Sequence, residues 1–256
     1  MKAAKAGKSA KEQKSAKLGK TPKTETTAKA GKSPCVLVID VGGTNVKLLA
    51  TGEKEARKHP SGRTMTPQKM VELVKKAASD WKYDCISLGY PGPIINGHPL
   101  REPHNLGRGW VVFNFQKAFG CPVKILNDAA MQAVGSYKGR RMLFLGLGTG
   151  LGSAMIVDGI LQPMELAHLG YKNGKSYEDY LGLRGLERMG KKKWRRCVAK
   201  VTRKLKTALD ADYVVLGGGN SKLLKEVPSG AELGNNENAF LGGFRMWGKD
   251  SVANPF

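Results

Sequence analysis

The sequence has few features of a secreted, disulfide-linked or membrane-spanning protein. Its four cysteines lie far apart and form no C-x-x-C pair, so neither a disulfide framework nor a cysteine-rich zinc site is expected. The N-terminus has no apolar stretch of the kind found in a secretory signal. The longest runs without Asp, Glu, Lys or Arg, residues 85–100 and 142–157, are interrupted by prolines or glycines. These absences predict a protein of the reducing cytoplasm with no membrane span.

Several common catalytic motifs are also missing. No segment has the Walker A spacing G-x-x-x-x-G-K-[ST], and the run Gly146–Gly152 is G-x-G-x-G-x-G rather than the dinucleotide-binding G-x-G-x-x-G. The zinc-protease motif H-E-x-x-H and the hydrolase motif G-x-S-x-G do not occur. P-loop, Rossmann, zinc-protease and α/β-hydrolase interpretations are therefore disfavoured.

Acidic residues are scarce relative to basic ones. The 256 residues carry 43 Lys and Arg against 21 Asp and Glu, a net charge of +22, of which the first 34 residues contribute +8. Those residues lack aromatic side chains and have too little apolar surface to offset the entropy of ordering, so a disordered Lys-rich tail is expected over 1–34. It is either a solubilising extension or a nonspecific polyanion-binding segment.

The remaining chain alternates buried strands with amphipathic helices, which predicts an α/β fold. Strands are expected at 35–41, 46–50, 85–90, 123–126, 142–147, 152–157 and 213–216, and helices at 65–81, 129–137, 177–181, 191–209 and 238–247. A strand, a glycine turn and a second strand occur twice, at 35–50 and 142–157. This duplication predicts two related lobes that face each other.

The two glycine turns are candidate phosphate sites. The first contains Gly42, Gly43 and Thr44, followed by Asn45 and Lys47, and the second contains Gly148, Thr149 and Gly150. Glycines let backbone N–H groups approach an anion closely, and the Thr hydroxyls add donors. Asp40, at the end of the preceding strand, could hold Mg²⁺ through water. Either turn could instead be an ordinary hairpin.

Other candidate groups have equally simple alternatives. Asp128, which follows Asn127 after a strand, could deprotonate a hydroxyl or merely cap the next helix. Glu165 and His168, three residues apart, could bind a polyol or belong to a solvated turn. Gly217, Gly218 and Gly219 could flank a base or an anion, or form a linker. Residues 184–206 hold eleven Lys or Arg and one Glu, which indicates either a solvated face or a track for polyphosphate.

In order along the chain, D-x-G-G-T-N, G-Y-P-G-P, P-H-N-L-G-R-G-W, N-D-A, G-x-G-T-G-x-G, E-x-x-H and L-G-G-G resemble the ROK sugar kinases. The resemblance covers about residues 35–247. Within the family, the short length and the absence of a zinc loop are most similar to polyphosphate glucokinases. The resemblance implies the two-lobed actin-like (ribonuclease H-like) ATPase fold of the actin/hexokinase superfamily. The expected lobes are residues 35–128 and 129–256, with the last helix packing back on the first lobe.

The resemblance also assigns roles to residues. It implies transfer of a phosphoryl group from polyphosphate or ATP, with Mg²⁺, to the 6-hydroxyl of glucose, and Asp128 as the base. The implied sugar-binding residues are Asn105, Asn127, Asp128, Glu165, His168 and Glu178. The implied donor-binding residues are Asp40, Gly42, Gly43, Thr44, Asn45, Lys47, Gly148, Thr149, Gly150, Gly217, Gly218 and Gly219.

One departure from the family bears on metals and on the sugar loop. Many members carry C-x-C-G-x-x-G-C after an E-x-G-H segment and bind structural zinc there, whereas no such cysteines follow His168 and Ala167 replaces the usual glycine. Structural zinc is therefore not expected.

The family also implies a homodimer. The alternative function is a sugar-binding regulatory protein. Residues 1–34 are too polar to form the helix-turn-helix that such regulators carry.

Overall fold

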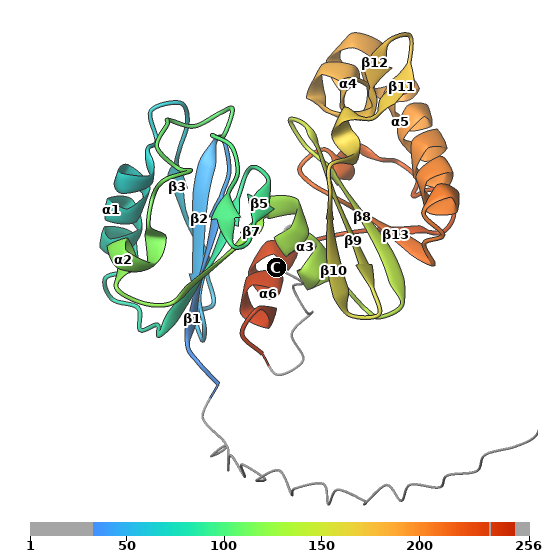
Figure 1. Cartoon of the computed structure of the whole chain (residues 1–256). Helices are drawn as coiled ribbons and strands as arrows, with labels where there is room; N and C mark the ends of the chain where they lie inside the picture. The colour runs from blue at the N-terminus through green and yellow to red at the C-terminus, as the bar shows by residue number, and fades with distance from the viewer. Residues whose placement is uncertain (1–32, 236, 249–256) are drawn as a thin grey trace, which may run out of the picture. The chain divides into compact units, whose positions relative to one another are not determined.

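The computed structural model describes residues 33–235 and 237–248. All of the predicted tail except its last two residues lies outside this range. From Ser33 onward the chain groups into one unit, which contains two five-stranded sheets (Figure 1).

The first sheet has the strand order β3-β2-β1-β4-β7. Strands β1, β2 and β3 are antiparallel neighbours, whereas β1, β4 and β7 run parallel. All six residues of both β1 and β4 are buried, as expected of strands covered on both faces. The strands are β1 (Val36–Val41), β2 (Asn45–Ala50), β3 (Arg57–Pro60), β4 (Cys85–Tyr90) and β7 (Val123–Asn127).

The second sheet repeats this topology with the order β10-β9-β8-β13-β14. Its first three strands are again antiparallel, and β8, β13 and β14 are parallel. The strands are β8 (Arg141–Leu147), β9 (Leu151–Val157), β10 (Ile160–Met164), β13 (Tyr213–Gly217) and β14 (Ala231–Leu233). The two predicted hairpins around glycine turns are β1–β2 in the first sheet and β8–β9 in the second.

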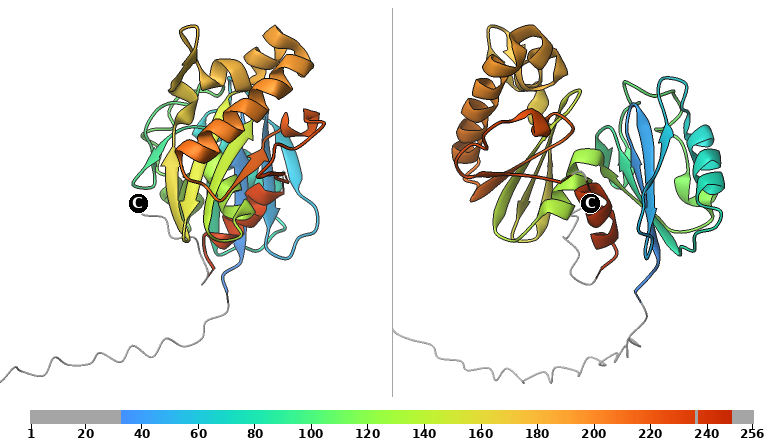
Figure 2. Two further views of the ribbon diagram at one scale, coloured as in Figure 1. Left: turned by 90° about the vertical axis from the view of Figure 1, so that its right-hand side faces the viewer. Right: turned by 180° about the vertical axis from the view of Figure 1, so that it is seen from behind.

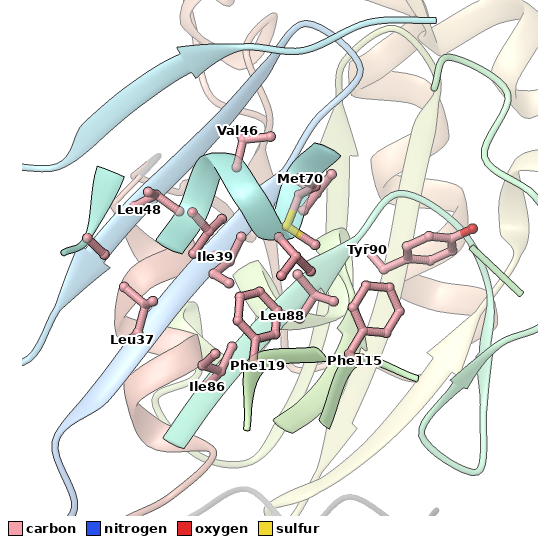
Figure 3. Packing of buried hydrophobic residues seen from close by; sticks show 14 of the residues in the cluster. Leu37, Ile39, Val46, Leu48, Met70, Ile86, Leu88, Tyr90, Phe115 and Phe119 are labelled. Atoms are coloured by element: carbon pink, nitrogen blue, oxygen red, sulfur yellow. The ribbon is translucent and has the colours of Figure 1, made fainter. Parts of the chain in front are cut away.

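Two helices, α1 (Pro67–Ala77) and α2 (Phe115–Phe119), cover one face of the first sheet. Thr66 caps α1 by accepting a hydrogen bond from the Lys69 N–H, and Pro67 occupies the first turn, where its missing N–H costs nothing. Figure 3 shows their side chains packed on the sheet, with Met70, Phe115 and Phe119 against Ile39 and Leu88. The predicted helix over 65–81 is therefore shorter, because Met65 and Trp81 lie outside it.

Helices α3 (Asp128–Ser136) and α6 (Asn238–Arg245) share a second core cluster with residues of both sheets. Glycines let the two helices touch, since a Cβ atom on Gly242 would overlap the Met131 carbonyl oxygen. The last helix also packs on the first sheet: Gly243 lies against Val38, and its carbonyl oxygen accepts a hydrogen bond from Ser87 Oγ. The polypeptide thus returns to its first sheet at its last helix.

Helix α5 (Leu183–Ala208) covers the outer face of the second sheet (Figure 2). Trp194, Val198 and Val201 are fully buried, which confirms the predicted apolar face. The helix begins eight residues earlier than expected, because it continues through a kink at Gly190, whose φ of 72° is a conformation that favours glycine.

Shorter elements complete the chain. They are β5 (Ile94–Ile95), β6 (His98–Pro99), η1 (Leu166–His168), β11 (Gly170–Lys172), β12 (Lys175–Ser176), α4 (Tyr177–Leu181) and η2 (Ser221–Leu223). The glycine triplet at 217–219 is followed by the short turn η2. Among the described residues, no helix has the length and apolar character that crossing a bilayer requires.

Candidate active site

The first glycine turn joins β1 to β2 above a partly buried ion pair. Asp40 is 8% exposed and lies opposite Lys47 in the hairpin, whose Nζ is 3.0 Å from Asp40 Oδ2. A charge in a buried position is costly unless it is paired. Lys47, the positive side chain predicted to serve this turn, is therefore already paired with Asp40.

Two carbonyl oxygens of this turn, those of Gly42 and Thr44, are bound within the protein. Gly42 N–H donates to Asn45 O at 2.9 Å. Ser61, just after β3, donates its hydroxyl to Gly42 O at 2.5 Å and its N–H to Thr44 O at 2.9 Å. The Thr44 side chain is exposed. Asn105 lies against Gly43, because a Cβ atom there would be 2.8 Å from Asn105 Cβ.

The second glycine turn, between β8 and β9, is held in a similar way. Gly148 N–H donates to Gly150 O at 3.1 Å, and the first residue of α5, Leu183, donates its N–H to Thr149 O at 3.1 Å. The side-chain amide of Asn220 donates to Gly148 O at 3.0 Å. Thr149, like Thr44, is exposed.

Glu178 of α4 lies against the second turn. Its Oε2 would be 2.5 Å from a Cβ atom at Gly150, and it accepts the Leu151 N–H at 3.3 Å. Its other oxygen is 3.2 Å from Arg184 Nη2. The structure thus places this predicted sugar-binding residue next to the predicted donor turn, with its charge balanced by the arginine.

Asp128 is the first residue of α3, but it is not the helix cap. Asn127 is the cap: its Oδ1 accepts the N–H groups of Ala129 and Ala130 at 3.0 and 3.2 Å, and its Nδ2 donates to Gly92 O at 3.1 Å. The capping alternative for Asp128 is therefore wrong. The hydrogen bonds of the Asn127 side chain go to backbone groups and not to the Asp128 carboxyl group.

The surroundings of the Asp128 carboxyl group disfavour its ionised form. Burial raises its pKa to about 7, and the negative charges of Asp40 and Glu165 act in the same direction. A hydrogen bond from Ala129 N–H to Oδ1, 2.8 Å long, opposes them without prevailing. Three predicted site residues from separate parts of the chain therefore interact electrostatically: Asp40 near the end of β1, Asp128 at the start of α3 and Glu165 after β10.

Glu165 precedes the short turn η1, and His168 is the last residue of that turn. Burial raises the pKa of Glu165, and His168 and Arg101 lower it by their charge, so Arg101 belongs to the same neighbourhood. Glu165 Oε2 is 3.9 Å from His168 Nε2, and 70% of the histidine side chain is accessible.

The glycine triplet follows β13 and contacts the second hairpin. Gly218 has φ of 80°, and a Cβ atom there would lie 2.5 Å from Leu147 O. The next residue after the triplet, Asn220, donates its N–H to the same oxygen at 2.8 Å. A Cβ atom at Gly219 would have no heavy atom within 4 Å, so the face of this glycine is open.

Sequence reasoning missed Ser61, Arg101 and Asn220. Ser61 lies in a polar stretch with no motif, and Arg101 comes near enough to Glu165 to lower its pKa only through the folding of a long loop. Asn220 follows the glycine triplet directly, so its position was the one available signal.

A model of the ROK family matches residues 36–165, or 130 of the 256 residues. The chain belongs to the ROK family. The family resemblance expected from the sequence is thereby confirmed, and the expected actin/hexokinase-type α/β fold is confirmed by its likeness to solved structures of sugar kinases.

Two relatives illustrate this membership at the sequence level. A polyphosphate glucokinase of Mycobacterium tuberculosis strain H37Rv is 27% identical over 206 residues, covering 72% of this chain and 77% of the relative. A glucokinase of Pyrobaculum calidifontis is 27% identical over 137 residues, 49% of this chain and 44% of the relative.

Two solved structures share the fold. An inorganic polyphosphate/ATP-glucomannokinase from Arthrobacter sp. strain KM superposes with a TM-score of 0.71 at 23% identity, covering 83% of this chain and 97% of that one. A ROK family glucokinase from Streptomyces griseus, in complex with glucose and AMPPNP, gives 0.68 at 15% identity, with 83% and 99% covered. The relatives support the predicted class of enzyme, a sugar kinase.

Proposed function

We propose that this ROK protein is a hexose kinase that transfers a phosphoryl group from polyphosphate or ATP to the 6-hydroxyl of glucose, with Asp128 as general base. The observation that carries the proposal is the Asp128 carboxyl group, held among Asp40 and Glu165 with a pKa of about 7. A base with a pKa near the working pH combines an adequate ionised fraction with an adequate affinity for the proton. Both glycine turns and the family membership support the same reaction.

In the proposed reaction the sugar O6 attacks the terminal phosphorus of the donor as its proton passes to Asp128. The new O–P bond forms as the bond to the bridging oxygen breaks, and the shortened polyphosphate or ADP leaves. Phosphoryl transfer asks mainly for alignment and charge neutralisation. The N–H groups and Thr hydroxyls of the two turns would donate hydrogen bonds to the phosphates. The proposed hexose ligands are Asn105, Asn127, Glu165, His168 and Glu178.

A divalent cation could be held at this site by one carboxylate together with the donor phosphates. Within the described residues no group of three or more His, Cys, Asp and Glu side chains is arranged to hold a metal. Asp40 supplies a single carboxylate, and Mg²⁺ is commonly held by one or two carboxylates together with phosphate oxygens and water. When bound with the donor, Mg²⁺ would neutralise phosphate charge, and Asp40 is the residue of this chain that would contact it through water.

The basic residues of α5 favour polyphosphate as a donor. Leu183, at the start of this helix, bonds to the second turn, and Arg184 next to it pairs with Glu178 beside that turn. From there the exposed cations Arg188, Lys191, Lys192, Lys193 and Arg196 extend along the helix. A phosphate polymer whose end lies at the turn could therefore contact cations along the rest of its length.

The test is sugar phosphate formation with a panel of hexoses, Mg²⁺ and either ATP or polyphosphate. We expect glucose 6-phosphate from the wild type and a loss of about 10²–10⁴-fold in kcat for Asp128→Asn, with glucose binding retained. Asp210→Asn is the matched control, because that aspartate is exposed and lies outside the site. Glucose binding without any turnover would favour the regulatory alternative, and near-normal turnover of Asp128→Asn would exclude it as the base.

A further inference from the structure

The two glycine turns share a feature that their motifs do not contain. In the first, Ser61 binds two carbonyl oxygens, Gly42 O through its hydroxyl and Thr44 O through its N–H. Ser61 comes from the end of β3, 17 residues beyond Thr44 in the chain. The carbonyl groups of Gly42 and Thr44 are thus bound by a residue outside the turn.

The second turn has the same arrangement with different partners. The Asn220 side chain binds Gly148 O, and Leu183 N–H binds Thr149 O. Asn220 comes from the loop after β13 and Leu183 from the start of α5. In both sheets, residues from outside the turn therefore bind its carbonyl oxygens, although these residues come from unrelated segments.

This arrangement decides which groups each turn offers to a ligand. Carbonyl oxygens carry partial negative charge and repel phosphate, whereas N–H groups attract it. Within the described residues, no acceptor contacts the N–H groups of Gly43, Thr44, Thr149 or Gly150. With the carbonyl groups of Gly42, Thr44, Gly148 and Thr149 bound by Ser61, Asn220 and Leu183, each turn presents N–H donors and an exposed Thr hydroxyl.

We propose that Ser61 and Asn220 are positioning residues for the phosphoryl donor: their side chains hold turn carbonyl groups away from the phosphates and keep the N–H groups directed at them. This inference rests on the proposed function, because it assumes that the turns bind the donor. It assigns no contact between either side chain and the substrate. Each acts through the turn that it holds.

The experiment compares donor affinity with sugar affinity in the variants. Ser61→Ala removes the hydroxyl, whereas Ser61→Thr keeps it. Asn220→Asp keeps the shape of the side chain but replaces the donating amide with a carboxylate that cannot donate. Ser136→Ala and Asn238→Ala are matched controls, since Ser136 donates to Gln132 O within α3 and Asn238 donates to Ser136 Oγ.

We expect Ser61→Ala to raise the KM for the donor about 2- to 10-fold, the range expected for one lost hydrogen bond, with the KM for glucose unchanged. Ser61→Thr should restore the donor KM, and Asn220→Asp should exceed the effect of Ser61→Ala. Binding of tripolyphosphate, followed by calorimetry without sugar, should weaken in parallel. Both controls should bind it like the wild type.

Unchanged tripolyphosphate affinity in Ser61→Ala and Asn220→Asp would overturn the proposal, as would equal losses of donor and glucose affinity, which indicate a merely structural role. Failure of the proposed function looks different, because the wild type itself would then form no sugar phosphate from any donor. Tripolyphosphate binding by the wild type separates the two cases.

Discussion

At the scale of single residues, the Asp128 carboxyl group is subject to opposing influences. Its place at the start of α3 and its bond from Ala129 N–H favour the ionised form. Burial, Asp40 and Glu165 favour the neutral form, and they prevail, since the pKa lies near 7. A side chain that a simple capping role would leave ionised at every physiological pH is thereby tuned to titrate.

The pH dependence of catalysis should follow this group. Because the proposed base must be ionised, kcat/KM for glucose should fall about tenfold per unit as the pH drops below about 7. Asp40→Asn should move this limb to lower pH, because it removes a charge that raises the Asp128 pKa. A pH–rate profile from 5 to 9 at saturating donor is the measurement. A flat wild-type profile down to pH 5 would contradict the assignment.

The same pKa predicts how stability depends on pH. Between the unfolded value of 3.8 and the folded value of about 7, the folded protein binds more protons than the unfolded one, so this group makes the free energy of unfolding fall as pH rises. Asp128→Asn has no such penalty. Its stability relative to the wild type should increase by about 1–3 kcal/mol from pH 5 to pH 8, as measured by urea unfolding. A constant difference would show that the carboxyl group remains well solvated.

The residue types of the candidate site were accessible from the sequence, but their partners were not. Asp128 follows a buried strand, where an acid could act as a base or cap a helix, and the resemblance to the ROK family assigned it the role of base. Which of Asn127 and Asp128 caps α3 depends on one backbone angle, and the structure settles it for Asn127. Ser61 joins the first turn only because β3 pairs with β2, and β3 itself has the polar sequence RKHP, which gives no strand pattern.

At the scale of elements, buried apolar runs predicted the central strands well. Strands β1, β4 and β8 lie within a residue of their expected limits, since both faces of each are covered and the sequence is predominantly apolar. The edge strands β3, β10 and β14 were missed, because short half-exposed strands lack that pattern. The start of α5 was missed because Gly190 interrupts its helical periodicity.

The contact of α3 with α6 depends on glycine and can be tested by adding one methyl group. A Cβ atom at Gly242 would overlap Met131 O, so Gly242→Ala must force the helices apart and should cost about 3 kcal/mol of unfolding free energy. Gly170→Ala is the matched control, because no heavy atom lies within 4 Å of a Cβ atom there. Chemical denaturation of both variants is the measurement, and equal stability would contradict the close helix contact.

At the scale of the whole molecule, the two sheets have equivalent strand orders, as the duplicated strand–turn–strand pattern suggested. The return of α6 to β1 and β4 joins residues more than 150 positions apart, such as Ser87 and Gly243, and no local pattern specifies such a pair. The limits of the two lobes at 128 and 129, and the homodimer, stay predictions.

The net charge of +22 belongs to the whole chain, and its effect on the donor can be measured. Replacing Lys191, Lys192 and Lys193 with alanine should raise the KM for polyphosphate severalfold and reduce its salt dependence, with a smaller effect on ATP. The same number of exposed lysines on α1, Lys69, Lys75 and Lys76, provides the control. Kinetics at two salt concentrations with both donors decide the matter, and equal salt sensitivity of ATP and polyphosphate would remove the argument for the polymer.

The hydrogen bonds to the carbonyl groups of the two turns have a consequence for how such an enzyme could change its phosphoryl donor. A surface that offers mainly hydrogen-bond donors discriminates by charge and is insensitive to what is attached beyond the anion. If the turns bind the donor as we propose, exchanging a nucleotide for an inorganic phosphate chain leaves them unchanged, and we expect any preference to be set by the open face beside Gly219 and by the cations of α5. On this proposal donor choice is a separable trait, adjustable without rebuilding the centre at which the phosphoryl group moves.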